Sequence, residues 1–523
     1  MKAKCFINVF FVFVLWAGIG FHLSAQWSIE RIKEVNLPNV EFKLIEQIPA
    51  GDYTVPGQRS AMKDMPEFVR ISLVSKPAPE SHIRIEVWLP THWNGRYLGA
   101  GNAGNGGGLP FGSLELGVRY GFAVATTDMG SWLGAGSMEH KPDRWTDFGY
   151  RASREMTVAA KALINAYYGR APKYSYFFGS STGGRQVLMH AQRYPDDYDG
   201  ILCGSPASNS THLHGSFLWI HQLFNEKPGT YLTQQQAEAL TDAVMKKNAG
   251  KDGGHPDDQF LNDPRLASIN PDELDFLSPD QKSIMKKIYK GPVNPITNEP
   301  FFTSIAMGSE YAKDIGIVSL QDTLSEILYL FFPFRWVLGA AFNALKFDFD
   351  KDFDRFNAIL APLFNATNPD LSPFKAKGGK MIMYAGASDP LTPFQDAVLY
   401  YDRVIDHFGS VEKVHDFFRF FLVPGLNHNN GGRGPCNIGQ RISDPSQPAE
   451  SNVFISLIRW VEEGIAPEKI IGSKWETPYS MPIYPYPTFS HLLPGREPGI
   501  VTNYQPVVHE RGLVVVPAPR YVK

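Results

Sequence analysis

Cysteine is scarce in this chain, with three among 523 residues. Only Cys203 and Cys436 lie beyond the N-terminal segment, so one disulfide at most can form, although secreted proteins are often rich in them. Cys203 closes an apolar, strand-like run that begins at Asp199, and we expect a buried free thiol there. A hydrophobic core must therefore stabilise the fold, and 43% hydrophobic residues are enough for a large one.

Runs of basic residues and long apolar segments are also lacking. The net charge is −3 and no stretch concentrates Lys or Arg, which gives no electrostatic footprint for nucleic acid or an anionic membrane. After residue 26 no segment has about eighteen uninterrupted apolar residues, the length expected of a membrane-spanning helix. We expect a globular protein whose substrate is a small molecule or the end of a polymer.

Residues 1–26 have the features of a secretory signal peptide. Lys2 and Lys4 supply the positive charge, Phe6–Ile19 the apolar core and Leu23–Ala25 a small-residue cleavage site. This pattern predicts a secreted or periplasmic protein. An uncleaved membrane anchor is the alternative, but the apolar core is short for a bilayer.

Segments typical of strands and helices alternate in two parts of the chain. Strands are predicted at 69–90, 96–99, 121–126 and 173–178, and a helix at 152–168. After Pro206 the sequence turns to long polar and helical stretches, and the alternation resumes at Lys375. This order predicts an α/β fold with a mostly parallel sheet, helices on both faces and a large insertion. We place the first part of the core at 27–207, the inserted lid at 208–370 and the second part of the core at 371–523.

A G-x-S-x-G pattern runs from Gly179 to Gly183, between a predicted strand and a helix-like segment. In an α/β-hydrolase the chain turns sharply at this point, so the nucleophilic serine takes a strained backbone conformation and small residues must stand two positions before and after it. Ser181 fits, whereas Ser180 has Phe178 two residues before it. The motif therefore predicts an α/β-hydrolase fold with Ser181 as nucleophile.

A serine nucleophile needs a general base and a carboxylate that orients the base, and in this fold the chain order is Ser, then Asp or Glu, then His, at strand ends. Asp389 follows the strand-like run 379–385, and His428 follows 417–423. Taken singly, Asp389 is also typical of a turn cap and His428 of a loop histidine bonded to backbone. Three other histidines, His190, His407 and His415, lie on or beside predicted helices. The order and placement favour a triad of Ser181, Asp389 and His428.

An oxyanion hole needs two backbone N–H groups aimed at the developing charge. Thr182, the residue after the nucleophile, supplies one. The glycine-rich loop Gly99–Gly108 follows a predicted strand, and we take Gly101 as its candidate donor. The loop lacks the Gly-Lys-Ser/Thr ending of a phosphate-binding loop, and a purely flexible loop is the alternative.

An aromatic cluster, Phe331–Trp336, has two interpretations. It forms the core of the lid, or it is a wall of the substrate pocket on which an aromatic acyl group stacks. In the second case Trp336 contacts the substrate and Arg335 meets a substrate carboxylate, although a solvent-exposed arginine is the commoner outcome. We carry both as candidate substrate-binding residues.

Nine blocks of sequence carry a resemblance to a known family: Trp93–Arg96, Tyr176–Gln186, Ala191–Pro195, Asp199–Gly200, Phe347–Asp350, Pro369–Leu371, Gly378–Lys380, Asp389–Pro390 and Trp460–Glu462. The chain resembles the tannase and feruloyl esterase family of α/β-hydrolases, which also includes mono-(2-hydroxyethyl) terephthalate hydrolases. The resemblance covers most of the mature chain. It implies that Ser181, Asp389 and His428 are the catalytic residues and that the insertion is a lid that builds the specificity pocket.

The chain departs from this family beside the expected triad. The family has a cysteine before the nucleophile and another after the catalytic histidine, joined by a disulfide; here these positions are Ser180 and Asn429. Because both partners are replaced together, we infer a lineage without the bridge, in which hydrogen bonds and packing hold His428 against Ser181.

A second departure concerns the calcium loop that the family commonly carries in its lid. The nearest stretch, 248–258, lacks the first aspartate of that loop and is longer. Asp252, Asp257 and Asp258 offer oxygen ligands, but we expect a solvated polar loop and no cofactor.

Together these features predict a secreted serine carboxylic ester hydrolase for phenolic or other aromatic acyl esters, of feruloyl or galloyl type. The ester is a small molecule or is linked to a polysaccharide, and we expect no nucleic-acid partner and no membrane partner after signal removal. The alternatives are a hydrolase or acyltransferase for non-aromatic acyl esters, and a non-catalytic binding protein on the same scaffold.

Overall fold

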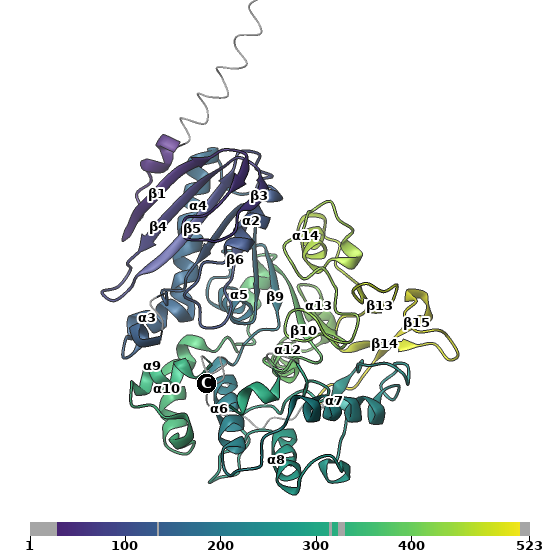
Figure 1. The fold of residues 1–523 in the computed structure, drawn as a ribbon. Helices are drawn as coiled ribbons and strands as arrows, with labels where there is room; N and C mark the ends of the chain where they lie inside the picture. The colour runs from purple at the N-terminus through teal and green to yellow at the C-terminus, as the bar shows by residue number, and fades with distance from the viewer. Residues whose placement is uncertain (1–28, 133–134, 313–315, 323–329, 513–523) are drawn as a thin grey trace, which may run out of the picture.

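The computed structural model describes residues 29–132, 135–312, 316–322 and 330–512, so the predicted signal peptide lies outside it. Within these residues the main sheet has nine strands (Figure 1). Across the sheet they are β1 (Val40–Ile48), β4 (Phe68–Ser75), β5 (Ile83–Pro90), β7 (Ala123–Thr127), β6 (Arg96–Ala100), β8 (Tyr174–Ser180), β9 (Gly200–Gly204), β10 (Lys380–Gly386) and β11 (Phe418–Val423). The strands from β7 to β11 in this order are parallel, while β1, β4 and β5 pair in antiparallel fashion.

Helices cover both faces of this sheet because its strands are apolar on both sides. The helices of this part are α2 (Phe111–Arg119), α3 (Pro142–Thr146), α4 (Ala152–Tyr168), α5 (Thr182–Arg193), α11 (Ser372–Ala376), α12 (Phe394–Phe408), α13 (Val411–His415) and α14 (Val453–Glu463). In β10, Met381 and Met383 join one hydrophobic cluster, which includes residues of α4, α5 and α12, and Ile382 and Tyr384 join another, which includes residues of α2 and α14. This is the α/β-hydrolase fold that the sequence predicts, and the predicted helix at 152–168 is confirmed as α4.

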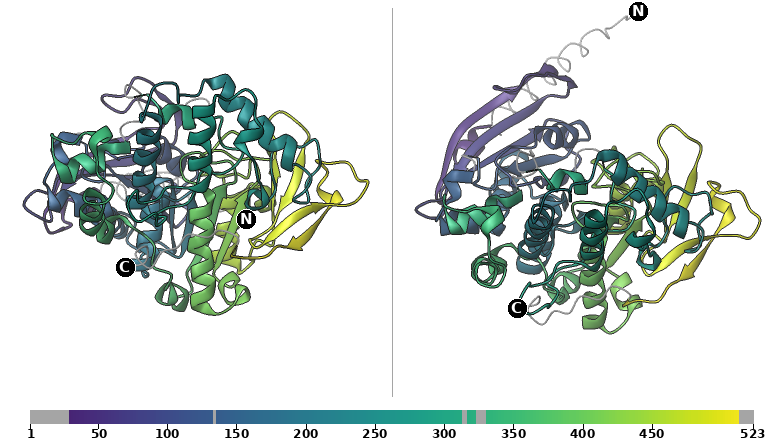
Figure 2. Two further views of the ribbon diagram at one scale, coloured as in Figure 1. Left: turned by 90° about the horizontal axis from the view of Figure 1, so that it is seen from below. Right: turned by 60° about the horizontal axis from the view of Figure 1, so that its bottom comes forward.

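The segment between β9 and α11 is largely helical and gathers below the sheet in Figure 1, as the views of Figure 2 also show. Its helices are α6 (Ser210–Phe224), α7 (Gln234–Asn248), α8 (Pro279–Lys290), α9 (Phe332–Leu338) and α10 (Asp352–Phe364). Helices α7 and α8 each begin at a capping box, Thr233 with Gln236 and Ser278 with Gln281, which satisfies the first backbone N–H groups. Most members of a third hydrophobic cluster belong to this segment.

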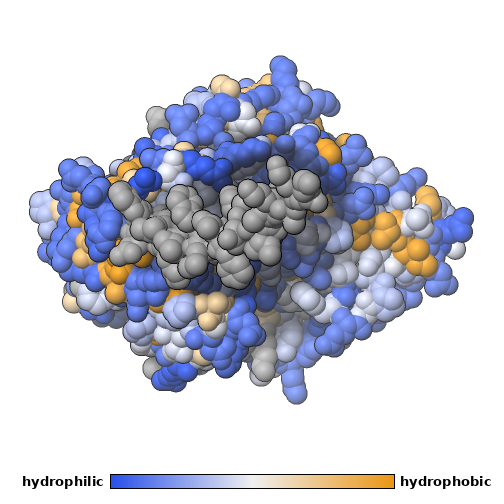
Figure 3. Space-filling view, turned by 90° about the horizontal axis from the view of Figure 1, so that it is seen from above, coloured by the Kyte–Doolittle hydropathy of each residue, from blue (hydrophilic) through white to orange (hydrophobic). Residues whose placement is uncertain are grey.

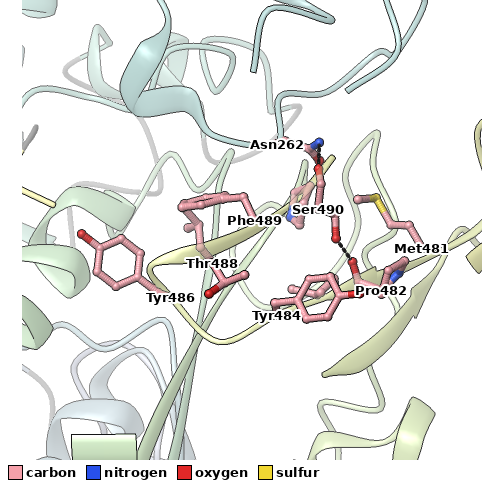
Figure 4. Close-up of a pocket in the computed structure, with 11 residues that line it drawn as sticks. Asn262, Met481, Pro482, Tyr484, Tyr486, Thr488, Phe489 and Ser490 are labelled. Atoms are coloured by element: carbon pink, nitrogen blue, oxygen red, sulfur yellow. Dashed lines mark hydrogen bonds between the residues drawn. The ribbon is translucent and has the colours of Figure 1, made fainter. Parts of the chain in front are cut away.

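Short hairpins complete the fold. They are β2 (Gly51–Tyr53) with β3 (Met62–Met65), β12 (Ile470–Ser473) with β13 (Ser480–Ile483), and β14 (Thr488–Leu492) with β15 (Tyr504–Val508). The close-up in Figure 4 shows where the last of them meets the loop at Asn262, whose side-chain amide donates to the Ser490 carbonyl at 2.7 Å. The cavity at this joint measures about 10 Å³, room for about one water molecule, so it is a packing defect and no substrate site.

Both described cysteines are buried free thiols, which confirms the expectation for Cys203. Burial raises the pKa of the Cys436 thiol to about 12, so neither its position nor its charge state favours reactivity. The face seen in Figure 3 is mainly hydrophilic, with hydrophobic residues in small separate patches. Every helix in the described ranges falls short of the length and apolar character that crossing a bilayer requires.

Candidate active site

Ser181 occupies a sharp turn between β8 and α5. Its backbone angles, φ 60° and ψ −121°, lie in a region that residues other than glycine rarely adopt. The turn needs glycine on either side: a Cβ on Gly179 would lie 2.3 Å from the Gly183 carbonyl oxygen, and one on Gly183 would lie 2.8 Å from the Asn102 carbonyl oxygen. The strained serine and its small neighbours are therefore as the G-x-S-x-G motif predicts.

Two loops at the same edge of the sheet carry Asp389 and His428. They follow the neighbouring parallel strands β10 and β11, so both leave the sheet at its carboxyl edge. The loops are joined by backbone hydrogen bonds, from the Ser388 N–H to the Leu426 carbonyl at 3.0 Å and from the Ala387 N–H to the Val423 carbonyl at 2.9 Å. This pairing fixes the position of one loop relative to the other.

The side chains of these loops meet in a short hydrogen bond. His428 Nδ1 lies 2.8 Å from Asp389 Oδ2, and the carboxylate is fully buried. The other oxygen, Oδ1, accepts the backbone N–H groups of Leu391 at 2.8 Å and Thr392 at 3.0 Å, and the Thr392 hydroxyl donates to Oδ2 at 2.7 Å. Asp389 thus caps its own turn and also bonds the imidazole, which leaves His428 Nε2 for other partners.

Ser181 and His428 line one cavity of about 570 Å³. Its wall is made of Ala103, Gly104, Asn105, Ser180, Ser181, Thr182, Ala207, Leu213, His214, Phe217, Ala312, Leu330, Leu391, Thr392, Asn427, His428, Asn429, Asn430 and Gly431. A volume of this size is typical of small-molecule sites. Ser180 and Asn429, the two positions where the family has its cysteines, both belong to this wall. A nucleophile, a base and a buried carboxylate beside a cavity are the groups that acyl transfer requires.

The rival histidines lie outside this cavity and have other partners. His190 is fully buried and 3.2 Å from Asp197, His407 is 3.2 Å from Asp370, and His415 Nε2 is 3.1 Å from the Tyr486 carbonyl. Burial lowers the pKa of both His190 and His415. Each of them serves a local contact away from Ser181.

The glycine-rich loop requires a correction. The N–H of Gly101 donates to the Phe178 carbonyl at 2.9 Å, because the chain still follows β8 at this point, so Gly101 is not an oxyanion donor. The next amide, of Asn102, donates to Gln186 Oε1 at 2.8 Å. Ala103 follows, and it is the first residue of the loop on the cavity wall. The Thr182 hydroxyl donates to the Gly104 carbonyl at 2.6 Å and so ties this loop to the start of α5.

Arg335 and Trp336 require a second correction, because neither lines the cavity. Arg335 pairs with Glu139 and its side chain is 45% exposed. Trp336 is 1% exposed and its ring contacts Phe148 edge-on, with 5.0 Å between centroids. Of the two interpretations of the aromatic cluster, a packing role in the core of the inserted segment is the one observed, since Trp336 faces inward and Arg335 outward.

The loop that corresponds to the family's calcium site is held by hydrogen bonds and an ion pair within the chain. The Asp252 carboxylate accepts backbone N–H groups from Asn262 at 2.6 Å and Asp263 at 3.0 Å, while the Asp257 side chain is 91% exposed. Asp263 pairs with the buried guanidinium of Arg265 at 2.6 Å, so the negative charge of Asp263 is already balanced by an arginine of the chain. Calcium takes six to eight oxygen ligands, and among the described residues no group of three His, Cys, Asp or Glu side chains is arranged for a metal.

The sequence did not point to helix α6, which supplies a wall of the cavity through Leu213, His214 and Phe217. The helix is buried nearly all round, so no amphipathic pattern distinguishes its cavity side from the rest. The one available signal is chemical: histidines at 212, 214 and 221 in an otherwise apolar segment at the start of the insertion.

The fold and this site define an α/β-hydrolase. The family model for tannase and feruloyl esterase matches residues 69–294 and 335–505, and the chain belongs to that family. An uncharacterized esterase of Xanthomonas campestris pv. campestris is 32% identical over 86% of this chain and 85% of its own, and a probable feruloyl esterase B of Emericella nidulans is 28% identical over 84% and 86%. The crystal structure of feruloyl esterase B from Aspergillus oryzae superposes with a TM-score of 0.84 at 25% identity, covering 93% of this chain and all of that one. The protein is a carboxylic ester hydrolase.

Proposed function

We propose that Ser181, His428 and Asp389 are the catalytic triad of an esterase for aromatic acyl groups of the feruloyl or galloyl type. The observation that carries this proposal is a 2.8 Å hydrogen bond to the buried Asp389 from His428, which lies on the wall of the cavity that Ser181 also lines. This bond holds the imidazole with its proton on Nδ1 and its lone pair on Nε2, the form that a general base needs.

The reaction uses these side chains and water. Ser181 Oγ attacks the ester carbonyl carbon while His428 Nε2 takes its proton, and the imidazolium is stabilised by Asp389. The tetrahedral intermediate collapses, the C–O bond to the alcohol breaks, and Nε2 returns the proton to the leaving oxygen. Water then attacks the acyl-enzyme with His428 as base, which releases the acid and restores Ser181.

The oxyanion is stabilised by backbone N–H groups, for which we propose Thr182 and Ala103. Thr182 is the first residue of α5, so its N–H lacks a partner within the helix and lies at the positive end of the helix dipole. Ala103 lies on the cavity wall just beyond the two amides that are already bonded. The hydrogen bond from the Thr182 hydroxyl to the Gly104 carbonyl ties the loop that carries Ala103 to the start of α5.

The cavity favours an uncharged acyl group. Of its described lining residues none is Lys, Arg, Asp or Glu, and much of the wall is apolar. An acyl group that ends in a carboxylate, as in a terephthalate monoester, meets no cation among these described lining residues, and Arg335 pairs with Glu139 instead. We therefore treat 208–370 as a lid whose helix α6 forms the wall against the acyl group, and take the alcohol to be small or part of a polysaccharide.

Two adjacent serines allow a matched test. Ser181→Ala should abolish turnover of feruloyl, galloyl, terephthaloyl and short-chain esters and labelling by a fluorophosphonate, whereas Ser180→Ala should retain both, because Ser180 lines the same cavity without the elbow conformation. In the wild type we expect the feruloyl or galloyl ester to be turned over fastest. Equal rates for Ser181→Ala and wild type would refute the proposed nucleophile.

A further inference from the structure

His214 stands on the cavity wall with one ring nitrogen already bonded. It belongs to α6 and lines the cavity that Ser181 and His428 share. Its Nδ1 lies 2.6 Å from the Leu330 carbonyl oxygen. A carbonyl oxygen can only accept, so Nδ1 must carry the proton. The geometry therefore fixes the tautomer of this histidine.

The second ring nitrogen, Nε2, is consequently a hydrogen-bond acceptor. The residue is 9% exposed, and burial lowers the pKa of the imidazole to about 4, an effect that the nearby Arg185 charge adds to. The ring is neutral at ordinary pH, and its Nε2 has no hydrogen-bond partner within the described part of the chain. Nε2 is not one of the buried side-chain atoms that lack a partner, so it is open to the cavity. A bound molecule that displaces solvent from Nε2 without donating to it would leave a buried acceptor unpaired, which is unfavourable, so a molecule that donates is selected over one that does not.

The surroundings of His214 restrict what that donor is. Leu213, Phe217 and Leu330 are apolar and line the same cavity, and the Phe217 ring stands edge-on to the imidazole at 6.2 Å between centroids. Such a wall suits the flat face of an aromatic ring in the substrate, and His214 Nε2 can then accept a hydrogen bond from a polar group on the edge of that ring. An ammonium group is less suited because no carboxylate is among the described lining residues. A phenolic hydroxyl supplies both the ring and the donor.

We propose that His214 Nε2 accepts a hydrogen bond from a phenolic hydroxyl on the acyl ring and so selects hydroxylated aromatic esters. The proposal rests on the esterase function given above and names the substrate class of that site. His214 is a specificity-determining residue and takes no part in the proton transfers at Ser181.

The test compares two esters that differ in the donor and hardly in size, methyl 4-hydroxycinnamate and methyl 4-fluorocinnamate. The wild type should prefer the hydroxy ester by about 10-fold in kcat/KM, mainly through KM, because the bond is present in the bound substrate as well as in the transition state. His214→Leu should reduce the preference to about 2-fold or less. His214→Gln, which keeps an acceptor oxygen, should retain part of it.

A matched control lies on the same helix. His212 is also buried and bonded through Nδ1 to a carbonyl, that of Phe301 at 2.6 Å, but it does not line the cavity. His212→Leu should leave the wild-type preference unchanged, whereas a loss equal to that of His214→Leu would overturn the assignment. If His214→Leu does not fold, the wild type and His214→Gln decide, since equal kcat/KM for the two esters in the wild type refutes the proposal. Turnover of neither ester, with Ser181 unlabelled by fluorophosphonate, would instead refute the esterase function.

Discussion

Replacing Asp389 by asparagine should lower kcat by about 10⁴-fold, equivalent to about 5.5 kcal/mol of transition-state stabilisation. The carboxylate accepts two backbone N–H groups at Oδ1 and, at Oδ2, the Thr392 hydroxyl and His428 Nδ1. An asparagine has one acceptor oxygen, which must face the two backbone donors. Its NH₂ group then faces the N–H at His428 Nδ1, and two hydrogen-bond donors cannot bond each other. The imidazole must therefore move its proton to Nε2, and that tautomer cannot take the proton of Ser181.

Thr392→Val is the control for this variant. It removes the hydroxyl donor, whose oxygen is 2.7 Å from Asp389 Oδ2, but leaves the carboxylate to accept from His428. A hydrogen bond to a charged group contributes about 1.5 kcal/mol or more, so we expect a loss of about tenfold in kcat together with a comparable loss of stability. The tautomer is unchanged in this variant, which separates the two effects.

The assay is the initial rate on an aromatic methyl ester at saturation, with the fraction of folded protein measured by urea unfolding. Asparagine has the shape of aspartate, so Asp389→Asn should remain folded. A kcat for Asp389→Asn within tenfold of wild type would refute the tautomer argument. A loss of kcat for Thr392→Val as large as that for Asp389→Asn would also refute it. The cause would then be the general loss of a hydrogen bond that orients the imidazole, and not the position of its proton.

Two further outcomes are expected. Ser180→Cys combined with Asn429→Cys should form a disulfide under oxidising conditions, since both positions line one cavity. The disulfide closes a loop of about 250 residues and should stabilise the protein by up to about 5 kcal/mol. Two free thiols after oxidation would show that the two positions do not face each other. From the charge and apolar pattern of residues 1–26 we also infer export to the periplasm or medium. The intact mass of the protein recovered from the natural host should then correspond to a chain that begins near residue 27. A full-length mass would contradict this inference.

Local sequence patterns predicted much of the fold. The helix at 152–168 and the strands of the sheet other than β1 follow from apolar patterns, and β10 and β11 were placed correctly because strands buried on both faces are continuous apolar runs. The strained turn at Ser181 was also predictable, since its glycines are adjacent in sequence and the steric reason is local. Asp389 and His428 could be proposed because each directly follows such a strand.

Contacts between distant segments could not be predicted in this way. The sequence predicted Gly101 as an oxyanion donor, but its N–H donates to the carbonyl of Phe178, 77 residues later along the chain. Arg335 and Trp336 adjoin each other in an aromatic run, and only the packing of Trp336 against Phe148 and the pairing of Arg335 with Glu139 decide which way each faces.

The sequence alone determined the family, through motifs spread along the chain, and the α/β-hydrolase core, through the periodicity of its strands and helices. It also indicated the proposed nucleophile, base and orienting carboxylate, because each of them lies within a few positions of a strand end. The tertiary structure alone decided which residues line the cavity. A buried helix has no polar side that marks the direction of the cavity, so the place of His214 depends on how α6 packs between the sheet and the rest of the insertion. Its proton is fixed by the carbonyl of Leu330, more than a hundred residues away in the chain.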